Sequence, residues 1–149
     1  MNRAPQELRT YLLTAVTAQR RRLFQVEANA NLFVAVLQEN RNKGRFELHA
    51  FVVMPDHVHL LLTPAEDVSL EKAMQFLKGG FSFRLRSRMD VWERGYDSRR
   101  IADKSHFDTC QRYVEENPVR ARMANAAEKY PYGSRGREGL VDPRPAWFG

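Results

Sequence analysis

The chain has 149 residues, a length that fits one compact domain, and it is 43% hydrophobic, 28% charged and 11% aromatic. This composition excludes a disordered or fibrous protein. The net charge is +6, and arginine supplies most of the positive side chains. Because arginine binds phosphate with two parallel hydrogen bonds and stacks on bases, we expect nucleic acid as the partner.

Two further features bear on the compartment. The first ten residues contain no apolar signal segment, and the longest apolar runs, such as 50–54, are far too short to cross a bilayer. We therefore expect an intracellular, cytoplasmic protein without a membrane partner. The lone Cys110 excludes an internal disulfide and fits a reducing compartment. Its neighbours indicate a small buried helix residue rather than a nucleophile.

The first elements are a strand and a helix. Residues 11–17 are apolar and β-branched enough for a strand, and residues 19–22 supply a basic loop. From Val26 to Leu37, apolar side chains recur at steps of three and four, which predicts a helix with one face on a core. This helix fades after Asn40, before a glycine suited to a turn.

Residues 45–63 predict a hairpin with Met54–Pro55–Asp56 as its loop. Position 52 then pairs with 58, 50 with 60 and 48 with 62. One face becomes wholly apolar and collects Phe46, Leu48, Ala50, Val52, Val58, Leu60 and Leu62. The opposite face collects Glu47, His49, Phe51, Val53, His57, His59 and Leu61. Since a slip of one residue would mix the two sets, we expect His57 and His59 to leave the main core together.

Two more helices and a short strand follow. Ser69 is the predicted N-cap of a helix to about residue 85, which Gly79–Gly80 interrupts. Residues 91–101 include a short strand, and a third helix runs from about 103 to 117, where Pro118 breaks it. From about residue 131 we expect an irregular tail. The result is one α+β domain over 1–149, an antiparallel sheet with helices packed on one face and the other face open.

His57 and His59 stand one residue apart on a predicted strand, so both side chains point the same way, roughly 7 Å apart along the strand. Two neutral imidazoles in this position can converge on one metal ion, although structural histidine pairs also occur on strands. A histidine-triad nucleotide hydrolase would need a third histidine at position 61. The chain has Leu61 there, which argues against that enzyme class.

Tyr113 and Asn117 are four residues apart on the third predicted helix, and His106 lies seven residues before Tyr113 on the same stripe. Helical spacing therefore presents the phenol and the carboxamide together toward the open face of the sheet. A helical tyrosine is more commonly a packing residue, so spacing alone leaves its role open. Asn117 also precedes Pro118, so it could instead be the N-cap of a short helix from Val119 to Met123.

These motifs resemble a known family. The segments FELHAFVVMPDHVHLLLTP (46–64), LKGGFSFRL, VWERGY and YVEENPVRA (113–121) occur in order over residues 8–134. Together they are similar to the single-tyrosine transposases of the His-hydrophobe-His superfamily, in particular the REP-associated tyrosine transposases. The resemblance implies a ferredoxin-like fold and cleavage of DNA strands. It also implies that Tyr113 is the nucleophile and that His57, His59 and Asn117 are the metal ligands, with both histidines in the catalytic site.

The chemistry that this resemblance implies is cleavage of single-stranded or hairpin DNA through a 5′-phosphotyrosine, which leaves a free 3′-hydroxyl. The resemblance favours Mg²⁺ or Mn²⁺, whereas imidazole ligands alone would favour Mn²⁺ or Zn²⁺, so the identity of the metal stays open. Monomer and homodimer both remain possible. The basic residues expected to contact DNA are Lys78, Arg84, Arg86, Arg88, Arg112 and Arg120.

The chain departs from the family pattern after YVEENPVRA. A glycine and two aliphatic residues usually follow, but this sequence has Arg122–Met123–Ala124. The stretch after VWERGY also matches only loosely. The alternative function is therefore a protein derived from a transposase that binds hairpin DNA or RNA without cutting it.

Overall fold

The computed structural model describes residues 7–137 and 139–148. The single domain predicted over 1–149 extends beyond them, since residues 1–6, 138 and 149 lie outside this description. The strands are β1 (Tyr11–Val16), β2 (Phe46–Met54), β3 (His57–Pro64) and β4 (Asp97–Arg100). The α-helices are α1 (Glu27–Asn42), α2 (Leu70–Leu85) and α3 (Lys104–Arg120). Short 3₁₀ helices are η1 (Ala18–Arg20), η2 (Leu23–Gln25), η3 (Ala127–Lys129) and η4 (Ala146–Phe148).

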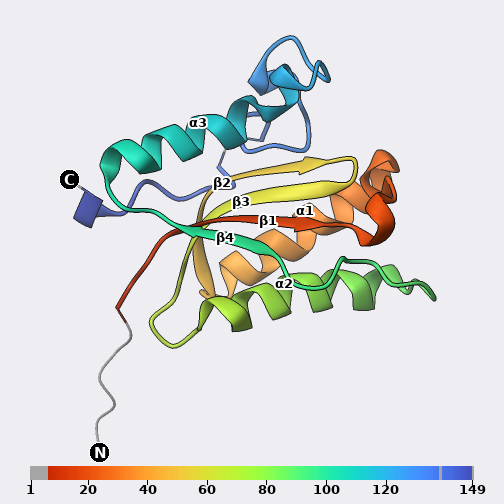
Figure 1. Cartoon of the computed structure of the whole chain (residues 1–149), viewed down its shortest axis with the longest axis horizontal. Coiled ribbons are helices and arrows are strands. Elements are labelled where there is room, and N and C mark those ends of the chain that lie inside the picture. The colour runs from red at the N-terminus through yellow and green to blue at the C-terminus, as the bar shows by residue number, and fades with distance from the viewer. Residues whose placement is uncertain (1–6, 138, 149) are drawn as a thin grey trace, which may run out of the picture.

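The four strands form one antiparallel sheet in the order β2-β3-β1-β4 (Figure 1). The chain order β1-α1-β2-β3-α2-β4 is that of the ferredoxin-like fold, so the predicted α+β class is confirmed. In the described part of the chain, no helix is both long and apolar enough to span a membrane.

Helices α1 and α2 cover one face of the sheet, and the main core lies beneath them. Phe24, Phe33 and Phe81 pack their rings there with centroids 5.3 to 5.6 Å apart. The predicted interruption of α2 at Gly79–Gly80 is wrong, because the helix runs straight through both residues. A Cβ atom at Gly80 would lie 3.4 Å from the side chain of Val36, so this glycine serves the close approach of α1 and α2.

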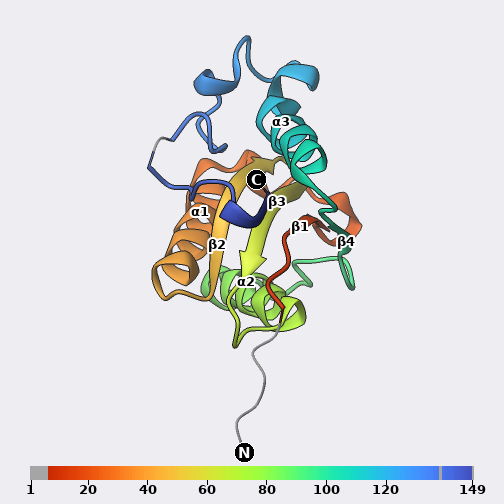
Figure 2. The same cartoon turned by 90° about the vertical axis from the view of Figure 1, so that its left-hand side faces the viewer.

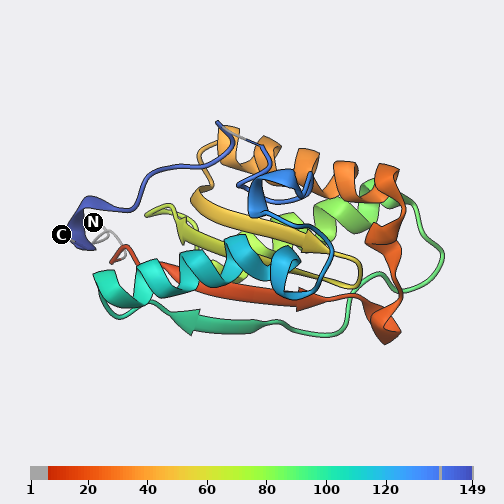
Figure 3. The ribbon, with the colours of Figure 1, turned by 90° about the horizontal axis from the view of Figure 1, so that it is seen from above.

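Helix α3 lies on the opposite face of the sheet and runs along the strands (Figures 1 and 3). The prediction of helices on one face holds for α1 and α2, whereas α3 partly covers the face expected to be open. The physical reason is a second apolar surface on β2 and β3 that needs burial. The sheet residues of this surface are Ala50, Val52, Met54 and Leu61. They pack against the inward-facing residues of α3, which are Phe107, Cys110 and Val114. The buried helical position predicted for Cys110 is confirmed.

The hairpin register differs from the prediction at its tip. Met54 belongs to β2 and pairs with His57, so the turn is Pro55–Asp56, and Val52 lies opposite His59 instead of position 58. A bulge between Leu48 and Ala50 restores the predicted pairing of positions 48 and 62. Ala50 and Val52 therefore face α3, while Phe51 and Val53 face the main core. Because all four side chains are apolar, the hydrophobic pattern could not distinguish the two registers.

Helix α3 continues through Pro118 to Arg120, so its predicted end at residue 117 is wrong. Pro118 is buried, and its carbonyl accepts a hydrogen bond from Met123 N at 2.8 Å. The missing proline N–H removes one helical hydrogen bond only two residues before the last residue of the helix, which keeps the cost local. Asn117 consequently lies inside α3, so the alternative that it caps a following helix is wrong.

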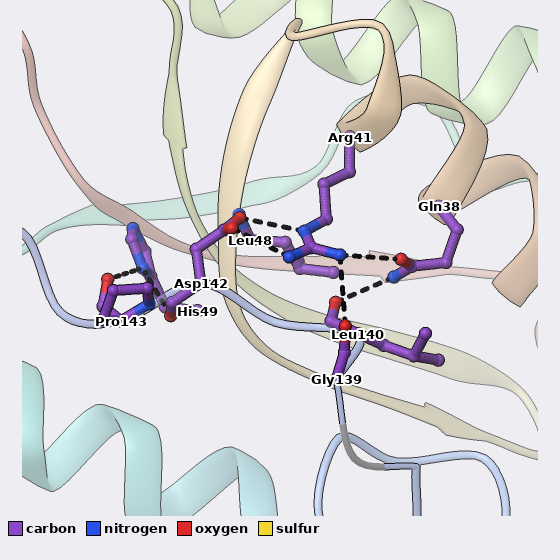
Figure 4. Close-up of polar contacts among 8 residues, drawn as sticks. All are labelled: Gln38, Arg41, Leu48, His49, Gly139, Leu140, Asp142 and Pro143. Atoms are coloured by element: carbon purple, nitrogen blue, oxygen red, sulfur yellow. Dashed lines mark hydrogen bonds and ion pairs between the residues drawn. The ribbon is translucent and has the colours of Figure 1, made fainter.

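The tail is irregular, as predicted, but it packs closely along the outer edge of β2 and then reaches α3 (Figure 2). Tyr132 O accepts a hydrogen bond from Val53 N at 2.7 Å. Near its end, Arg144 forms an ion pair of 3.1 Å with Asp108 of α3. We call the polar network in the middle of this segment the C-terminal clamp (Figure 4); it comprises Gln38, Arg41, Leu48, His49, Gly139, Leu140, Asp142 and Pro143. The clamp covers an edge that β2 would otherwise leave unpaired.

Candidate active site

Neighbouring strands place the polar residues of the candidate site in a row across the sheet. Thr14 of β1 lies opposite His59 of β3 on one side and opposite Asp97 of β4 on the other. His57 lies two residues before His59, and alternate residues of a strand point to the same face. Leu61, two residues further along, packs against α3. Both histidines therefore face α3 and leave the main core together.

His59 is held as a neutral imidazole. Its side chain is only 6% exposed, and its Nδ1 lies 2.9 Å from Thr14 Oγ1. Burial is the main cause that lowers the pKa of His59 to about 4, and the neighbouring His57 and Arg120 lower it further. At neutral pH the ring consequently carries no charge. When the Nδ1–H donates to Thr14, the lone pair on Nε2 is available.

His57 is oriented by the residue before it. Its Nδ1 lies 2.7 Å from Asp56 Oδ1, and Arg20 Nη1 lies 3.4 Å from the other oxygen of that carboxylate. Partial burial opposes ionisation of Asp56, but hydrogen bonds and charges from His57 and Arg20 outweigh it and lower the Asp56 pKa. The ionised carboxylate therefore accepts the Nδ1–H, which leaves Nε2 of His57 available as well.

The donor set of these two residues fits a divalent metal ion. Their ring centroids are 4.8 Å apart. A carboxylate that accepts the second N–H of an imidazole is the usual outer partner of a metal-bound histidine, and Asp56 is placed to act in this way toward His57. Among residues 7–137 and 139–148, no group of three or more His, Cys, Asp or Glu side chains is arranged around a common point. A third protein ligand would therefore have to be of another type.

Tyr113 projects from α3 beside His59. The inward stripe of α3 includes Cys110 and Val114, and Tyr113 stands at the edge of this stripe, where its side chain is 43% exposed. The ring centroids of Tyr113 and His59 are 5.4 Å apart. The guanidinium of Arg120 lies 4.7 Å from the Tyr113 ring centroid and donates a hydrogen bond to its carbonyl. One chain thus brings the phenol, two imidazoles and a cation together.

Asn117 is half-buried one helical turn beyond Tyr113. Its backbone carbonyl accepts a hydrogen bond from Ala121 N at 3.0 Å, which confirms a position within the helix. Its side-chain amide forms no hydrogen bond to any other described residue, so the amide oxygen is free to bind an ion. Its role as the third metal ligand stays a prediction.

The basic residues predicted to contact DNA divide between the two sides of the sheet. Arg112 and Arg120 are exposed on α3, next to Tyr113. The other four lie on or just after α2, across the sheet from the histidines, and are Lys78, Arg84, Arg86 and Arg88 (Figure 1). The structure does not bring this second group together with the candidate site, so its contact with DNA stays a prediction.

Two members of the second group already have protein partners. Arg84 forms an ion pair of 2.8 Å with Glu39. Lys78 Nζ donates to the carbonyl oxygens of Glu93 and Gly95 at 3.2 and 2.6 Å, and burial lowers its pKa. Arg86 and Arg88 are exposed. Of the four, these last two are the more accessible to an external phosphate.

Sequence reasoning missed the partners of both histidines. Asp56 is adjacent to His57, so the DH pair in MPDHVH was a usable signal. Thr14 is 45 residues from His59 in the sequence, and only the pairing of β1 with β3 brings them together. No local pattern could have identified this second partner.

The chain is similar to known proteins over most of its length. Residues 6–117 match the model of the family described as Transposase IS200 like. A protein of Haemophilus influenzae assigned to the REP-associated tyrosine transposases is 24% identical over 153 aligned positions, which cover 93% of this chain and 86% of the relative.

Solved structures share the fold. A REP-associated tyrosine transposase bound to a REP hairpin superposes with a TM-score of 0.74 at 18% identity, covering 97% of this chain and 91% of that one. A Deinococcus radiodurans protein described as a transposase gives a TM-score of 0.53 at 23% identity, covering 78% and 95%. The family resemblance predicted from the motifs is confirmed, and since the matched model spans more than half of its residues, this chain belongs to the IS200-like transposase family.

Proposed function

We propose that this transposase-family chain cleaves and rejoins single-stranded DNA at hairpin-forming sequences. Tyr113 is the nucleophile, and His57, His59 and Asn117 hold a divalent metal ion, Mg²⁺ or Mn²⁺. The observation that carries the proposal is the approach of the Tyr113 ring to within 5.4 Å of His59, itself next to His57. The protein would act in the cytoplasm.

The proposed step is a transesterification. The phenol oxygen of Tyr113 attacks the scissile phosphorus, a 5′-phosphotyrosine bond forms, and the bond from phosphorus to the 3′-oxygen breaks. The phenol loses a proton and the departing 3′-oxygen gains one, so the reaction is balanced and needs no ATP. When bound, the metal would polarise the phosphate oxygens and stabilise the charge that develops on them.

The protein side chains prepare this step in three ways. Asp56 and Thr14 orient the two imidazoles through Nδ1. Burial keeps His59 neutral, so that no proton competes with the metal for its lone pair. Arg120 lies over the Tyr113 ring, where its positive charge attracts a phosphate and stabilises the charge that develops on it. Since one chain supplies all these groups, a monomer suffices for cleavage.

Hairpin DNA is the proposed partner for two reasons. The relative in the superposed complex was solved with a REP hairpin. The net charge of this chain, +6, and its arginine-rich composition suit a polyanion. The alternative is a protein that binds hairpin DNA or RNA without cutting it. One observation favours that alternative. No third His, Cys, Asp or Glu side chain joins the two histidines among the described residues, so the third metal ligand would have to be the neutral carboxamide of Asn117.

Covalent trapping separates the two functions. The wild-type protein, incubated with end-labelled hairpin DNA and Mn²⁺, should form a denaturation-resistant adduct. Tyr113→Phe should bind the DNA with affinity within about threefold of wild type but lose roughly 10³-fold or more of the adduct, because only the attacking oxygen is removed. Tyr96→Phe is the matched control and should react normally. Equal adduct from the Tyr113→Phe protein would eliminate Tyr113 as the nucleophile, and no adduct from wild type on any hairpin would favour the binding protein.

A further inference from the structure

A groove opens directly beside Tyr113, between α3 and the β1–β4 edge of the sheet. Its volume is about 380 Å³, inside the range of roughly 300–1,000 Å³ that small-molecule sites occupy. We call it the α3–β4 groove. Its lining includes Leu12 and Thr14 of β1, Asp97 and Arg99 of β4, and His106, Cys110 and Tyr113 of α3.

The groove is continuous with the candidate active site. Thr14 lines the groove and also holds Nδ1 of His59, and Tyr113 forms part of its wall. In the strand register, Leu12 lies opposite Arg99. β4 is the last strand of the sheet, so its outer side has no strand neighbour among the described residues. A DNA strand whose scissile phosphate lies at Tyr113 therefore has the groove beside its next nucleotide.

The chemistry of the groove suits a flat, partly polar ring. Leu12 and Cys110 provide an apolar floor, and Tyr113 provides an aromatic wall. His106 is fixed in one tautomer, because its Nδ1 accepts a hydrogen bond of 2.9 Å from Ala102 N, which leaves the proton on Nε2 as a donor. Asp97, also on the lining, adds an acceptor. Nucleobases present such a combination of π-face, donors and acceptors.

Positive charge lies at the entrance. Arg99 is 73% exposed, with Asp97 3.9 Å away. Arg100, the next residue, is 53% exposed and does not line the groove. Because alternate residues of a strand point to opposite faces, Arg99 faces the groove and Arg100 faces away from it. The two arginines thus form a natural pair for comparison.

We propose that the α3–β4 groove binds the base of one unpaired nucleotide directly adjoining the scissile phosphate. This inference rests on the proposed function, because it takes the position of that phosphate from Tyr113 and the histidine pair. A base stacked within a duplex could not enter, so the groove selects single-stranded DNA at the cleavage position. The polar rim, with His106 as donor and Asp97 as acceptor, reads the identity of this base.

Abasic scanning tests the groove. The Tyr113→Phe protein binds without cutting, and its affinity is measured at constant salt for the hairpin that gives the adduct, or for the tightest-binding hairpin if none does. The base is removed from each single-stranded position in turn. We expect a loss of roughly 10-fold or more at one position next to the scissile phosphate and smaller losses elsewhere. A uniform profile, with no position standing out from its neighbours, would overturn the inference.

Second substitutions in the same protein assign the sensitive position to the groove. Arg99→Ala and His106→Ala should each shrink the abasic penalty at that position at least threefold. Arg100→Ala, which removes the same charge from the same strand, should weaken all binding but leave the penalty unchanged. An equal abasic penalty at that position in all three variants would refute the proposal that the groove binds the base. If Arg99→Ala and His106→Ala shrink the abasic penalty but the wild-type protein forms no adduct, base binding in the groove is supported and the proposed cleavage is refuted.

Discussion

His49 and His59 lie on neighbouring strands and are both buried, and burial is the largest cause of a lowered pKa for each. Their hydrogen bonds differ. His49 Nδ1 donates to Pro143 O at 3.0 Å (Figure 4), and its Nε2 accepts from the Thr63 hydroxyl at 2.8 Å. His59 bonds only Thr14 through Nδ1 among the described residues. Burial and a lowered pKa therefore do not distinguish the two histidines, whereas the Nε2 of His59, which has no hydrogen-bond partner among the described residues, and the neighbouring Tyr113 ring do.

The same contrast extends to the groups around each histidine. In the C-terminal clamp, the Asp142 carboxylate accepts Arg41 Nε and Nη2 at 3.0 and 2.9 Å and Leu48 N at 2.8 Å. Gln38 and Arg41 donate to the carbonyl oxygens of Leu140 and Gly139 (Figure 4). These donors and acceptors are used within the fold. At the site, two imidazole nitrogens and a carboxamide have no hydrogen-bond partner in the part of the chain that the structure describes, which is what ligand binding requires.

The largest predicted effect is that alanine substitutions of His57 and His59 impair cleavage, whereas the same substitution of His49 impairs stability. His57→Ala and His59→Ala should each reduce cleavage by roughly 10³-fold or more, because each would remove a ligand of the proposed metal ion, while the unfolding free energy falls by less than about 1.5 kcal/mol. His49→Ala should instead lower the unfolding free energy by about 2–4 kcal/mol, since it leaves buried polar partners unsatisfied. Cleavage assays and urea unfolding check this. An unfolding free energy that falls as far in His59→Ala as in His49→Ala would contradict the distinction between a structural and a functional histidine.

A smaller effect is expected from the outer partner of His59. Thr14→Val keeps the shape but removes the oxygen that holds Nδ1, so the Mn²⁺ concentration for half-maximal cleavage should rise roughly 10- to 100-fold. Thr14→Ser retains the oxygen and should remain within about threefold of wild type. Metal titrations of cleavage by the two variants measure this. Identical titrations for valine and wild type would show that His59 needs no orienting partner.

The smallest predicted effect concerns the clamp. Asp142→Asn should lower the unfolding free energy by about 1–2 kcal/mol, because it weakens a half-buried, bidentate pair with Arg41. Asp108→Asn, which affects the less buried pair with Arg144, should cost less than about 1 kcal/mol. Both variants should cleave at the wild-type rate per folded molecule. A cleavage defect in Asp142→Asn at full folding would mean that the clamp also shapes the site.

Much of this contrast could not be read from the sequence. Helical spacing and the N-cap Ser69 predicted α1 and α2 because those signals are local. The face of His57 and His59 was also predictable, since the apolar residues that alternate with them along the strand, Val58, Leu60 and Leu62, must be buried. The tip register was not, because both faces of β2 are apolar near Val52. Pro118 misled because a proline near a helix end can be buried and tolerated.

The long-range partners were equally hidden. Asp142 meets Leu48 at the bulge, and Thr14 meets His59 only through strand pairing. Such contacts depend on the complete sheet, and neither the hydrophobic period nor a turn residue encodes them. His49 and His59 therefore look alike in sequence, as two histidines on adjacent strands, until the hydrogen bonds of the fold distinguish them.

The most direct test of this account is nitrogen NMR of the histidine side chains during titration with Zn²⁺, a diamagnetic ion that imidazole binds well. The Nε2 resonances of His57 and His59 should shift together at one equivalent of metal, while both nitrogens of His49 stay in place. Asn117→Ser should weaken this binding without moving the His49 signals. Metal-dependent shifts at His49, or unshifted Nε2 resonances of both His57 and His59, would contradict the distinction between a closed structural histidine and an open metal site.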